Sequence, residues 1–362
     1  MDIDSLYYEA IELLKRLISL PSVSREESEV ADVLEDYLEN AGFLPRRKEN
    51  NVWALSPEWN PDKPVILLNS HLDTVKPVAG WTKDPFSPVE EAGKLYGLGA
   101  NDAGAPLVSL LMAFRLLTAK AQPINFIFLA SAEEEVSGKN GIESVLPELP
   151  SVDLAVVGEP TSLQAAIAEK GLMVLDAVIR GKSGHAAREE GENVIYKSLP
   201  VIEWFRNKQF PKESALLGKV KMTVSVIQAG TQHNVVPDEC RMVIDVRSND
   251  CYSNRELFDL IASECGCEIQ ARSFRLNSSF IKETHPLVRR AVLLGAKTFG
   301  SPTLSDQALM PFTSMKIGPG NSERSHSADE FIYCSEIREA IDFYVHLLDE
   351  LRLENRTPSL AD

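Results

Sequence analysis

Histidine and acidic residues stand at the ends of short apolar segments of this chain, where they could bind metal ions and move protons. His71 and Asp73 directly follow the apolar segment VILLNS. Open α/β sheets bind their ligands at the carboxyl ends of strands. We therefore expect His71 to bind a metal ion through one ring nitrogen while Asp73 holds the ring in place. Taken alone, this pair is a weak signal and more often forms a structural hydrogen bond.

An aspartate lies inside a glycine-rich segment further along the chain. Asp102 belongs to GLGANDAG, which matches neither a phosphate-binding loop nor a dinucleotide-binding loop. Glycines would let the backbone twist so that the Asp102 carboxylate points into a cleft. The alternative is that Asp102 caps the helix that follows.

Two further acidic segments and a second histidine add to the candidate metal-binding residues. These residues are Glu134, Glu135, Glu159 and His326. Glu134 and Glu135 belong to a run of three acids after an apolar segment, and adjacent acids repel one another unless a cation lies between them. Alternating side-chain directions would let one carboxylate bind a metal ion while its neighbour moves protons. Each segment alone fits a surface loop, but together two histidines and several carboxylates predict a paired zinc-like site.

The elements that position these residues alternate between apolar runs and amphipathic helical segments. This alternation predicts an α/β sheet covered by helices on both faces. Ser24 and Glu27 have the spacing of a capping box for the second helix. Around residue 170 the predicted order becomes strand, helix, two strands, helix and strand, as in a ferredoxin-like domain. We therefore predict a discontinuous domain of residues 1–169 and 280–362, with residues 170–279 inserted.

The composition excludes several classes of function. The 362 residues include 37 Lys and Arg against 53 Asp and Glu, a formal net charge of −16. Nucleic-acid and anionic-membrane surfaces need clustered cations, so neither partner is expected. The N-terminal residues lack the pattern of a secretory signal, and no apolar run reaches the roughly 18 residues of a membrane span. We expect a cytoplasmic protein, whose polar tail 354–362 frays.

Cysteine usage agrees with a reducing compartment. The chain has five cysteines, an odd number that fits reduced thiols better than a disulfide framework. Cys265 and Cys267 are too close in sequence for a zinc knuckle, and no second pair accompanies them. We expect no structural metal there.

Seven segments resemble, in order, the metallo-aminoacylase and peptidase family that includes acetylornithine deacetylase, succinyl-diaminopimelate desuccinylase, aminoacylase-1 and glutamate carboxypeptidase. They are HLDTV, GLGANDAG, AEEEVSG, VGEPTS, GKSGHAA, GTQHNVVPDECRMVIDVR and SHSADEF. The resemblance covers nearly the whole chain. It implies a zinc-peptidase-like three-layer α/β/α catalytic domain with an inserted ferredoxin-like α+β domain, which serves as a lid or for dimerisation.

The resemblance also implies two divalent metal ions, with zinc expected and cobalt or manganese as alternatives. It assigns their ligands as Asp102 between the two ions, His71 and Glu159 on one ion, and Glu135 and His326 on the other. Glu134 then corresponds to the general base, and Asp73 to the residue that supports the ligands. A cis peptide bond is implied between Asp102 and Ala103.

Three residues of the inserted segment match family positions near the substrate. His185 matches a histidine that reaches the active site of the partner subunit in a homodimer and stabilises the developing oxyanion. Asn234 and Arg247 match substrate contacts, and the planar guanidinium of Arg247 suits a carboxylate. Alternatively, Asn234 caps a turn and Arg247 pairs with a nearby acid. The chain departs from many members at Leu98 and Gly104, where a basic pair is missing.

The activity implied by the resemblance is metal-assisted hydrolysis of the linear amide of an N-acyl amino acid. N-acetylornithine, a substrate of arginine biosynthesis, is the leading candidate. N-succinyl-diaminopimelate, an acylcitrulline and a dipeptide remain open, because no residue separates an acetyl from a succinyl pocket. The alternative outside enzymes is a catalytically silent homologue that binds amino acids, and the complete set of predicted metal ligands argues against it.

Overall fold

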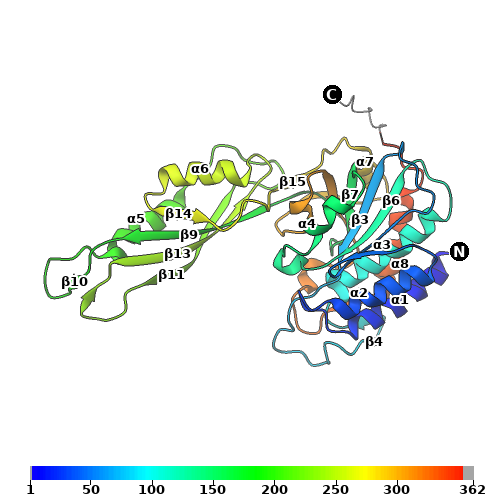
Figure 1. Cartoon of the computed structure of the whole chain (residues 1–362), viewed down its shortest axis with the longest axis horizontal. Coiled ribbons are helices and arrows are strands. Elements are labelled where there is room, and N and C mark those ends of the chain that lie inside the picture. The colour runs from blue at the N-terminus through cyan, green and yellow to red at the C-terminus, as the bar shows by residue number, and fades with distance from the viewer. Residues whose placement is uncertain (1, 354–362) are drawn as a thin grey trace. The chain divides into compact units, whose positions relative to one another are not determined.

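The computed structural model of the chain describes residues 2–353 (Figure 1). The tail 354–362, which we expected to fray, lies outside the described residues. The described residues form two compact units. Unit 1 runs to Ile167 and also contains Ile281–Phe299 and the residues from Ser305 onwards, whereas unit 2 comprises Ala168–Phe280 and Gly300–Leu304.

A mixed β-sheet lies at the centre of unit 1. In spatial order it contains β1 (Arg46–Lys48), β2 (Asn51–Leu55), β6 (Asn125–Ser131), β3 (Val65–His71), β7 (Leu154–Val157), β17 (Thr313–Lys316) and β8 (Ala165–Glu169). The neighbours β6, β3, β7 and β17 run parallel, while β1, β2 and β8 pair antiparallel. β15 (Ser279–Phe280) and β16 (Thr298–Ser301) pair with β8. Every residue of β3, β6 and β7 is buried, as expected of parallel strands covered on both faces.

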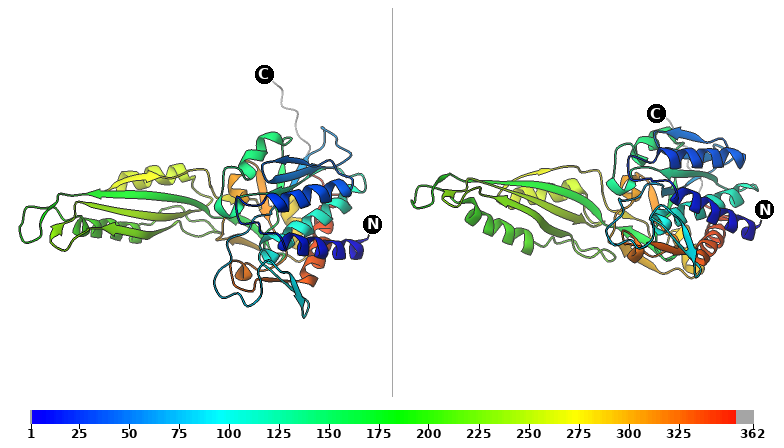
Figure 2. Two further views of the ribbon diagram at one scale, coloured as in Figure 1. Left: turned by 60° about the horizontal axis from the view of Figure 1, so that its bottom comes forward. Right: turned by 90° about the horizontal axis from the view of Figure 1, so that it is seen from below.

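Helices cover both faces of this sheet because strand side chains alternate in direction. Leu67 and Ile127 face one side, where they pack with α4 (Ile142–Val145). On the other side α3 (Ala105–Thr118) packs against β3 and β6, and the rings of Phe114 and Phe128 lie 6.0 Å apart. The helices α1 (Ile3–Ile18) and α8 (Cys334–Leu348) pack against α3. This layering confirms the predicted α/β fold (Figure 2).

The remaining elements of unit 1 are short. They are α2 (Ser28–Asn40), α7 (Pro286–Leu293), a small sheet of β4 (Val89–Glu91), β5 (Lys94–Tyr96) and β18 (Phe331–Tyr333), and the turns Ala100–Gly104, Glu134–Val136, Leu146–Glu148, Asp306–Leu309 and Ser322–Arg324. Within residues 2–353, none of the helices combines the length and apolar character that crossing a membrane requires.

Unit 2 has the strand and helix order that the sequence predicted for the inserted segment. Its elements are β9 (Gly171–Arg180), α5 (Val194–Asn207), β11 (Lys221–Ala229), β13 (Glu239–Ser248), α6 (Asn254–Glu264) and β14 (Glu268–Ala271), with the short ribbon of β10 (Gly184–His185) and β12 (Val235–Val236). The antiparallel sheet has the order β11, β13, β9, β14. Alternate residues such as Leu175 and Ile244 bury one face against both helices.

The capping box predicted at the second helix is wrong. α2 begins at Ser28, and Glu27 at its N-cap makes no side-chain capping bond. Ser24 Oγ instead donates to Asp73 at 2.7 Å, and the buried Glu27 carboxylate accepts the N–H of Glu133 at 3.2 Å. Both side chains therefore serve residues distant in sequence, because buried partners near the sheet edge compete with the local cap.

Candidate metal centre

Six of the predicted site residues meet in unit 1 at the carboxyl edge of the parallel strands. They are His71, Asp102, Glu134, Glu135, Glu159 and His326. His71 is the last residue of β3, and the turn carrying Glu134 and Glu135 follows β6. Glu159 follows β7, which pairs with β3 on its other side. Because these three strands are parallel neighbours, their ends bring the side chains to one place.

The two carboxylate oxygens of Asp102 face different partners. Asp102 Oδ1 lies 3.2 Å from His71 Nε2, and that nitrogen is 3.9 Å from Glu159 Oε1. Asp102 Oδ2 lies 3.6 Å from His326 Nε2, which is 3.0 Å from Glu135 Oε1. His71, Asp102 and Glu135 each place a ligand atom within 4.8 Å of the others. The arrangement therefore has two groups of nitrogen and oxygen atoms that meet at one carboxylate, and any of these atoms could bind a metal ion.

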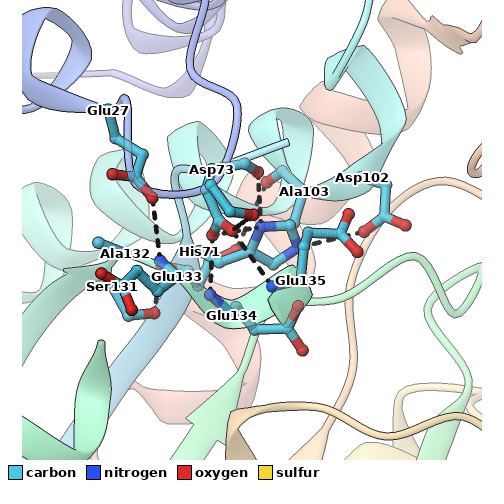
Figure 3. Close-up of polar contacts among 12 residues, drawn as sticks. Glu27, His71, Asp73, Asp102, Ala103, Ser131, Ala132, Glu133, Glu134 and Glu135 are labelled. Atoms are coloured by element: carbon cyan, nitrogen blue, oxygen red, sulfur yellow. Dashed lines mark hydrogen bonds and ion pairs between the residues drawn. The ribbon is translucent and has the colours of Figure 1, made fainter. Parts of the chain in front are cut away.

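Asp73 positions both His71 and the acidic turn (Figure 3). The Nδ1 atom of His71 lies 2.9 Å from the backbone oxygen of Asp73, which leaves Nε2 to face Asp102. The Asp73 carboxylate accepts the N–H groups of Glu134 at 3.1 Å and Glu135 at 3.2 Å. Such outer contacts fix the tautomer and orientation of a metal-binding histidine.

The acidic turn separates its two glutamates. Glu133 has φ +54°, a left-handed conformation that is uncommon outside glycine, and its N–H is held by Glu27. Figure 3 shows the Glu135 carboxylate beside Asp102, while Glu134 leaves the turn in another direction. This separation gives the two carboxylates different surroundings, as the sequence predicted.

Glycines shape the loop that carries Asp102. Gly99 has φ +76°, and a Cβ atom there would lie 2.6 Å from Thr74 Cγ2. A Cβ atom at Gly104 would lie 2.5 Å from the backbone oxygen of Gly99. Asp102 does not cap α3, whose N-cap residue Gly104 makes no side-chain capping bond. The peptide bond between Asp102 and Ala103 is cis, as the resemblance implied.

Glu330 holds this loop, and the sequence analysis did not single it out. Its buried carboxylate accepts three backbone N–H groups, from Gly99 at 3.1 Å, Asn101 at 2.8 Å and Asp102 at 2.9 Å. Burial and the charge of Asp102 raise the pKa of Glu330 to about 8, against the effect of these N–H groups. Glu330 lies in the segment SHSADEF, but nothing in that pattern shows that its carboxylate binds a loop so distant in sequence.

The electrostatics of the site fit bound cations. Burial raises the pKa of Glu134 well above its ordinary value and that of Glu159 to about 8, although the charge of His71 opposes both shifts. The hydrogen bond to Glu135 raises the pKa of His326 to about 9. Crowded carboxylates thus favour protons here, and divalent cations would replace those protons. Two imidazoles and three carboxylates are a donor set that suits zinc-like ions.

The three residues predicted in the inserted segment lie in unit 2, where His185 and Asn234 are neighbours and Arg247 is distant from both. His185 is exposed and pairs with Val235, next to the exposed Asn234. Arg247 lies near the far end of β13, about 26 Å from the first residue of that strand, Glu239, at the usual rise per strand residue. Its guanidinium binds both carboxylate oxygens of Asp245, at 2.9 Å and 3.1 Å. The alternative that Arg247 pairs with a nearby acid thus describes the structure, and its role toward substrate stays a prediction.

Comparison with known proteins extends over nearly the whole chain. The profile described as peptidase family M20/M25/M40 matches residues 67–350. Acetylornithine deacetylase of Proteus mirabilis is 27% identical over 380 residues, which cover 96% of this chain and 97% of that protein. Succinyl-diaminopimelate desuccinylase of Delftia acidovorans is 25% identical over 378 residues, with coverages of 94% and 98%.

Solved structures share the fold. Aminopeptidase PepT of Bacillus cereus superposes with a TM-score of 0.77 at 19% identity, covering 95% of this chain and 98% of that one. The YXEP protein of Bacillus subtilis, described as a dinuclear metal binding peptidase from the M20 family, superposes with a TM-score of 0.73 at 19% identity, with the same coverages.

Replacing Glu330 should loosen the loop that carries Asp102. We expect Glu330→Gln to weaken zinc binding by about 10- to 100-fold, the usual effect of removing an outer contact to a ligand. In the wild-type protein three N–H groups bind the two oxygens of the Glu330 carboxylate, whereas Gln offers them only one uncharged acceptor oxygen. Isothermal titration with Zn²⁺ measures the affinity, and Glu323→Gln, which changes an exposed acid in the turn Ser322–Arg324, is the matched control. Unchanged affinity in Glu330→Gln would contradict this role.

Proposed function

Because the chain belongs to peptidase family M20/M25/M40 and is a metal-dependent hydrolase, we propose that it cleaves the amide bond of an N-acyl amino acid. The observation that carries the proposal is the placement of Asp102 between two pairs of ligands. We propose that His71 and Glu159 hold one divalent ion and that Glu135 and His326 hold a second, with Asp102 shared. Zinc is the expected metal, and cobalt and manganese accept the same donors.

The chemistry follows from the residues around these ions. Bound divalent ions lower the pKa of water and polarise a carbonyl group. Glu134 is the base that takes the proton of the attacking water and returns it to the amide nitrogen as the C–N bond breaks. Burial raises the pKa of Glu134 well above its ordinary value, which makes its carboxylate a stronger base toward the proton of the water. The Asp73 carboxylate accepts the backbone N–H of Glu134 and so keeps Glu134 in place.

N-acetylornithine of arginine biosynthesis is the leading substrate. The relatives with whole-length similarity include an acetylornithine deacetylase, and that similarity supports this choice over peptides. Succinyl-diaminopimelate remains the first alternative, because a relative of nearly equal similarity is named for it. An acylcitrulline or a dipeptide follows. Leu98 and Gly104 offer no cation to a substrate carboxylate, so Arg247, once released from Asp245, is the proposed carboxylate contact.

We further propose that unit 2 acts as a lid and that two copies of the chain form a homodimer through unit 2. β11 is an edge strand of its sheet and exposes Ile227 by 51% of its surface, and the neighbouring α5 exposes Tyr196 by 71% and Leu199 by 60%. A long edge strand beside apolar side chains is a natural site for pairing with a second copy. His185 and Arg247 lie too far apart for one small substrate, and a partner subunit that supplies His185 removes this difficulty.

A catalytically silent homologue that binds amino acids is the alternative outside enzymes. A silent protein has no need of a general base, yet Glu134 lies beside the metal ligand Glu135 on a turn held by Asp73 and Glu27. The hydrogen bonds that hold the turn of Glu134 therefore favour an enzyme over a catalytically silent protein.

Glu134→Gln should abolish turnover without emptying the site. We expect kcat to fall by about a hundred- to ten-thousand-fold, the contribution of a general base, while the bound metal stays the same. Steady-state assays and metal analysis of the same preparation separate the two quantities. Glu58→Gln, an exposed acid of unit 1, is the control. A Glu134→Gln variant with near wild-type kcat would refute the assignment.

A panel of substrates tests the leading choice. The zinc- and cobalt-loaded protein is assayed for release of free amine from acetyl- and succinyl-ornithine, -citrulline and -diaminopimelate and from dipeptides. We expect the largest kcat/KM for N-acetylornithine. In Glu134→Gln we expect kcat for that substrate to be lower by the same factor of about a hundred to ten thousand. A preference for a succinylated substrate or for dipeptides would replace the acetylornithine assignment while keeping the reaction class.

Disrupting the exposed face of unit 2 should separate the subunits. We expect Leu199→Glu to convert a dimer into a monomer in light scattering after size exclusion, because burying the new charge in an apolar interface is costly. We also expect kcat to fall, since His185 then lacks a partner. Leu293→Glu, on an exposed apolar residue of unit 1, should leave the dimer intact. A monomeric wild-type protein would contradict the proposal.

A further inference from the structure

Unit 2 contains two thiols close enough to react with each other. Cys265 is the C-cap residue of α6, and Cys267 directly precedes β14. Their Sγ atoms are 3.7 Å apart, and the Cys267 thiol donates a hydrogen bond to Cys265. Gly266 between them has φ +71°, and open space surrounds the position of a Cβ atom there. The glycine is therefore explained by the turn that brings the thiols together rather than by close packing.

The surroundings of the pair favour one thiolate. The hydrogen bond from Cys267 lowers the pKa of Cys265 to about 6, and the same interaction raises the pKa of Cys267. At neutral pH the pair then shares a single proton, and the thiolate is the nucleophilic form of cysteine. Cys265 is buried, whereas Cys267 is partly exposed and offers a route to solvent.

The other buried cysteines lack this activation. Burial raises the pKa of Cys240 in unit 2 and of Cys334 in unit 1. Cysteines held neutral by apolar surroundings are inert. Cys251, which is also partly exposed, provides an internal comparison for access alone.

We propose that Cys265 and Cys267 are a reversible dithiol–disulfide pair that is oxidised by low-molecular-weight disulfides such as glutathione disulfide. The inference stands on unit 2 alone and does not depend on the proposed hydrolase activity. It assigns a modification site to the turn between α6 and β14.

The reaction proceeds by two thiol–disulfide exchanges. The shared proton moves along the hydrogen bond to Cys265, and the Cys267 thiolate attacks one sulfur of glutathione disulfide. The S–S bond of glutathione disulfide breaks, and one glutathione leaves as a thiolate, which takes the proton from Cys265. The Cys265 thiolate then attacks the Cys267 sulfur, forms the Cys265–Cys267 bond and releases the second glutathione thiolate. The protein loses two electrons, and glutathione disulfide is reduced to one glutathione thiol and one glutathione thiolate, which takes a proton from water.

The test is equilibration of the full-length protein in buffers of defined glutathione to glutathione disulfide ratio. Samples are quenched with acid, alkylated and mapped by peptide mass spectrometry. We expect Cys265 and Cys267 to become protected together as an internal disulfide, without bound glutathione, and to return to free thiols with dithiothreitol. Cys251→Ser should behave as wild type.

Two variants identify the order of the exchanges. In Cys265→Ser we expect glutathione to remain attached to Cys267, because the second thiol is missing. In Cys267→Ser, whose changed residue is partly exposed, we expect no internal disulfide and no adduct on the buried Cys265. Full alkylation of both thiols in wild-type protein at the most oxidising ratio would overturn the proposal. Lasting glutathione on wild-type Cys267, or a Cys240–Cys267 disulfide, would also overturn it.

Discussion

Mutual repulsion among buried and partly buried carboxylates is the interaction on which the rest of this structure depends. Asp73, Asp102, Glu134, Glu135 and Glu159 converge at the carboxyl edge of the parallel strands of unit 1. Burial there favours protonated carboxyl groups over charged ones. Such a cluster lasts only if positive partners are supplied. Two imidazoles, backbone N–H groups and the proposed divalent ions supply them, so part of the net charge of −16 belongs to the site rather than to the surface.

A second group of buried carboxylates binds the backbone N–H groups of the loops that carry the site residues. Asp73 accepts N–H groups from Glu134 and Glu135, Glu27 accepts the N–H of Glu133, and Glu330 accepts three N–H groups of the Asp102 loop. Hydrogen bonds from backbone amides stabilise a carboxylate without adding a charged side chain. The site loops therefore gain a fixed conformation, and their side chains stay available for ligands and protons.

Sequence reasoning reached the fold, and it placed His71, Glu134 and Glu159 because each follows an apolar run that forms a strand. Asp102 and His326 lie in loops, and only the family resemblance assigned them as ligands. Sequence reasoning could not reach the residues that support the site loops, since their partners are set by the tertiary structure. Ser24 and Glu27 have the spacing of a helix cap, yet they bind Asp73 and Glu133, 49 and 106 residues away. The pairing of Arg247 with Asp245 was within reach, because residues two apart on a strand share a face.

The measurement that tests the account most directly is anomalous X-ray diffraction at the zinc edge from crystals of the zinc-loaded protein. The account predicts two anomalous peaks on either side of the Asp102 carboxylate. One peak should lie among His71, Asp102 and Glu159, and the other among Asp102, Glu135 and His326. A single peak, or peaks that do not share Asp102, would contradict it.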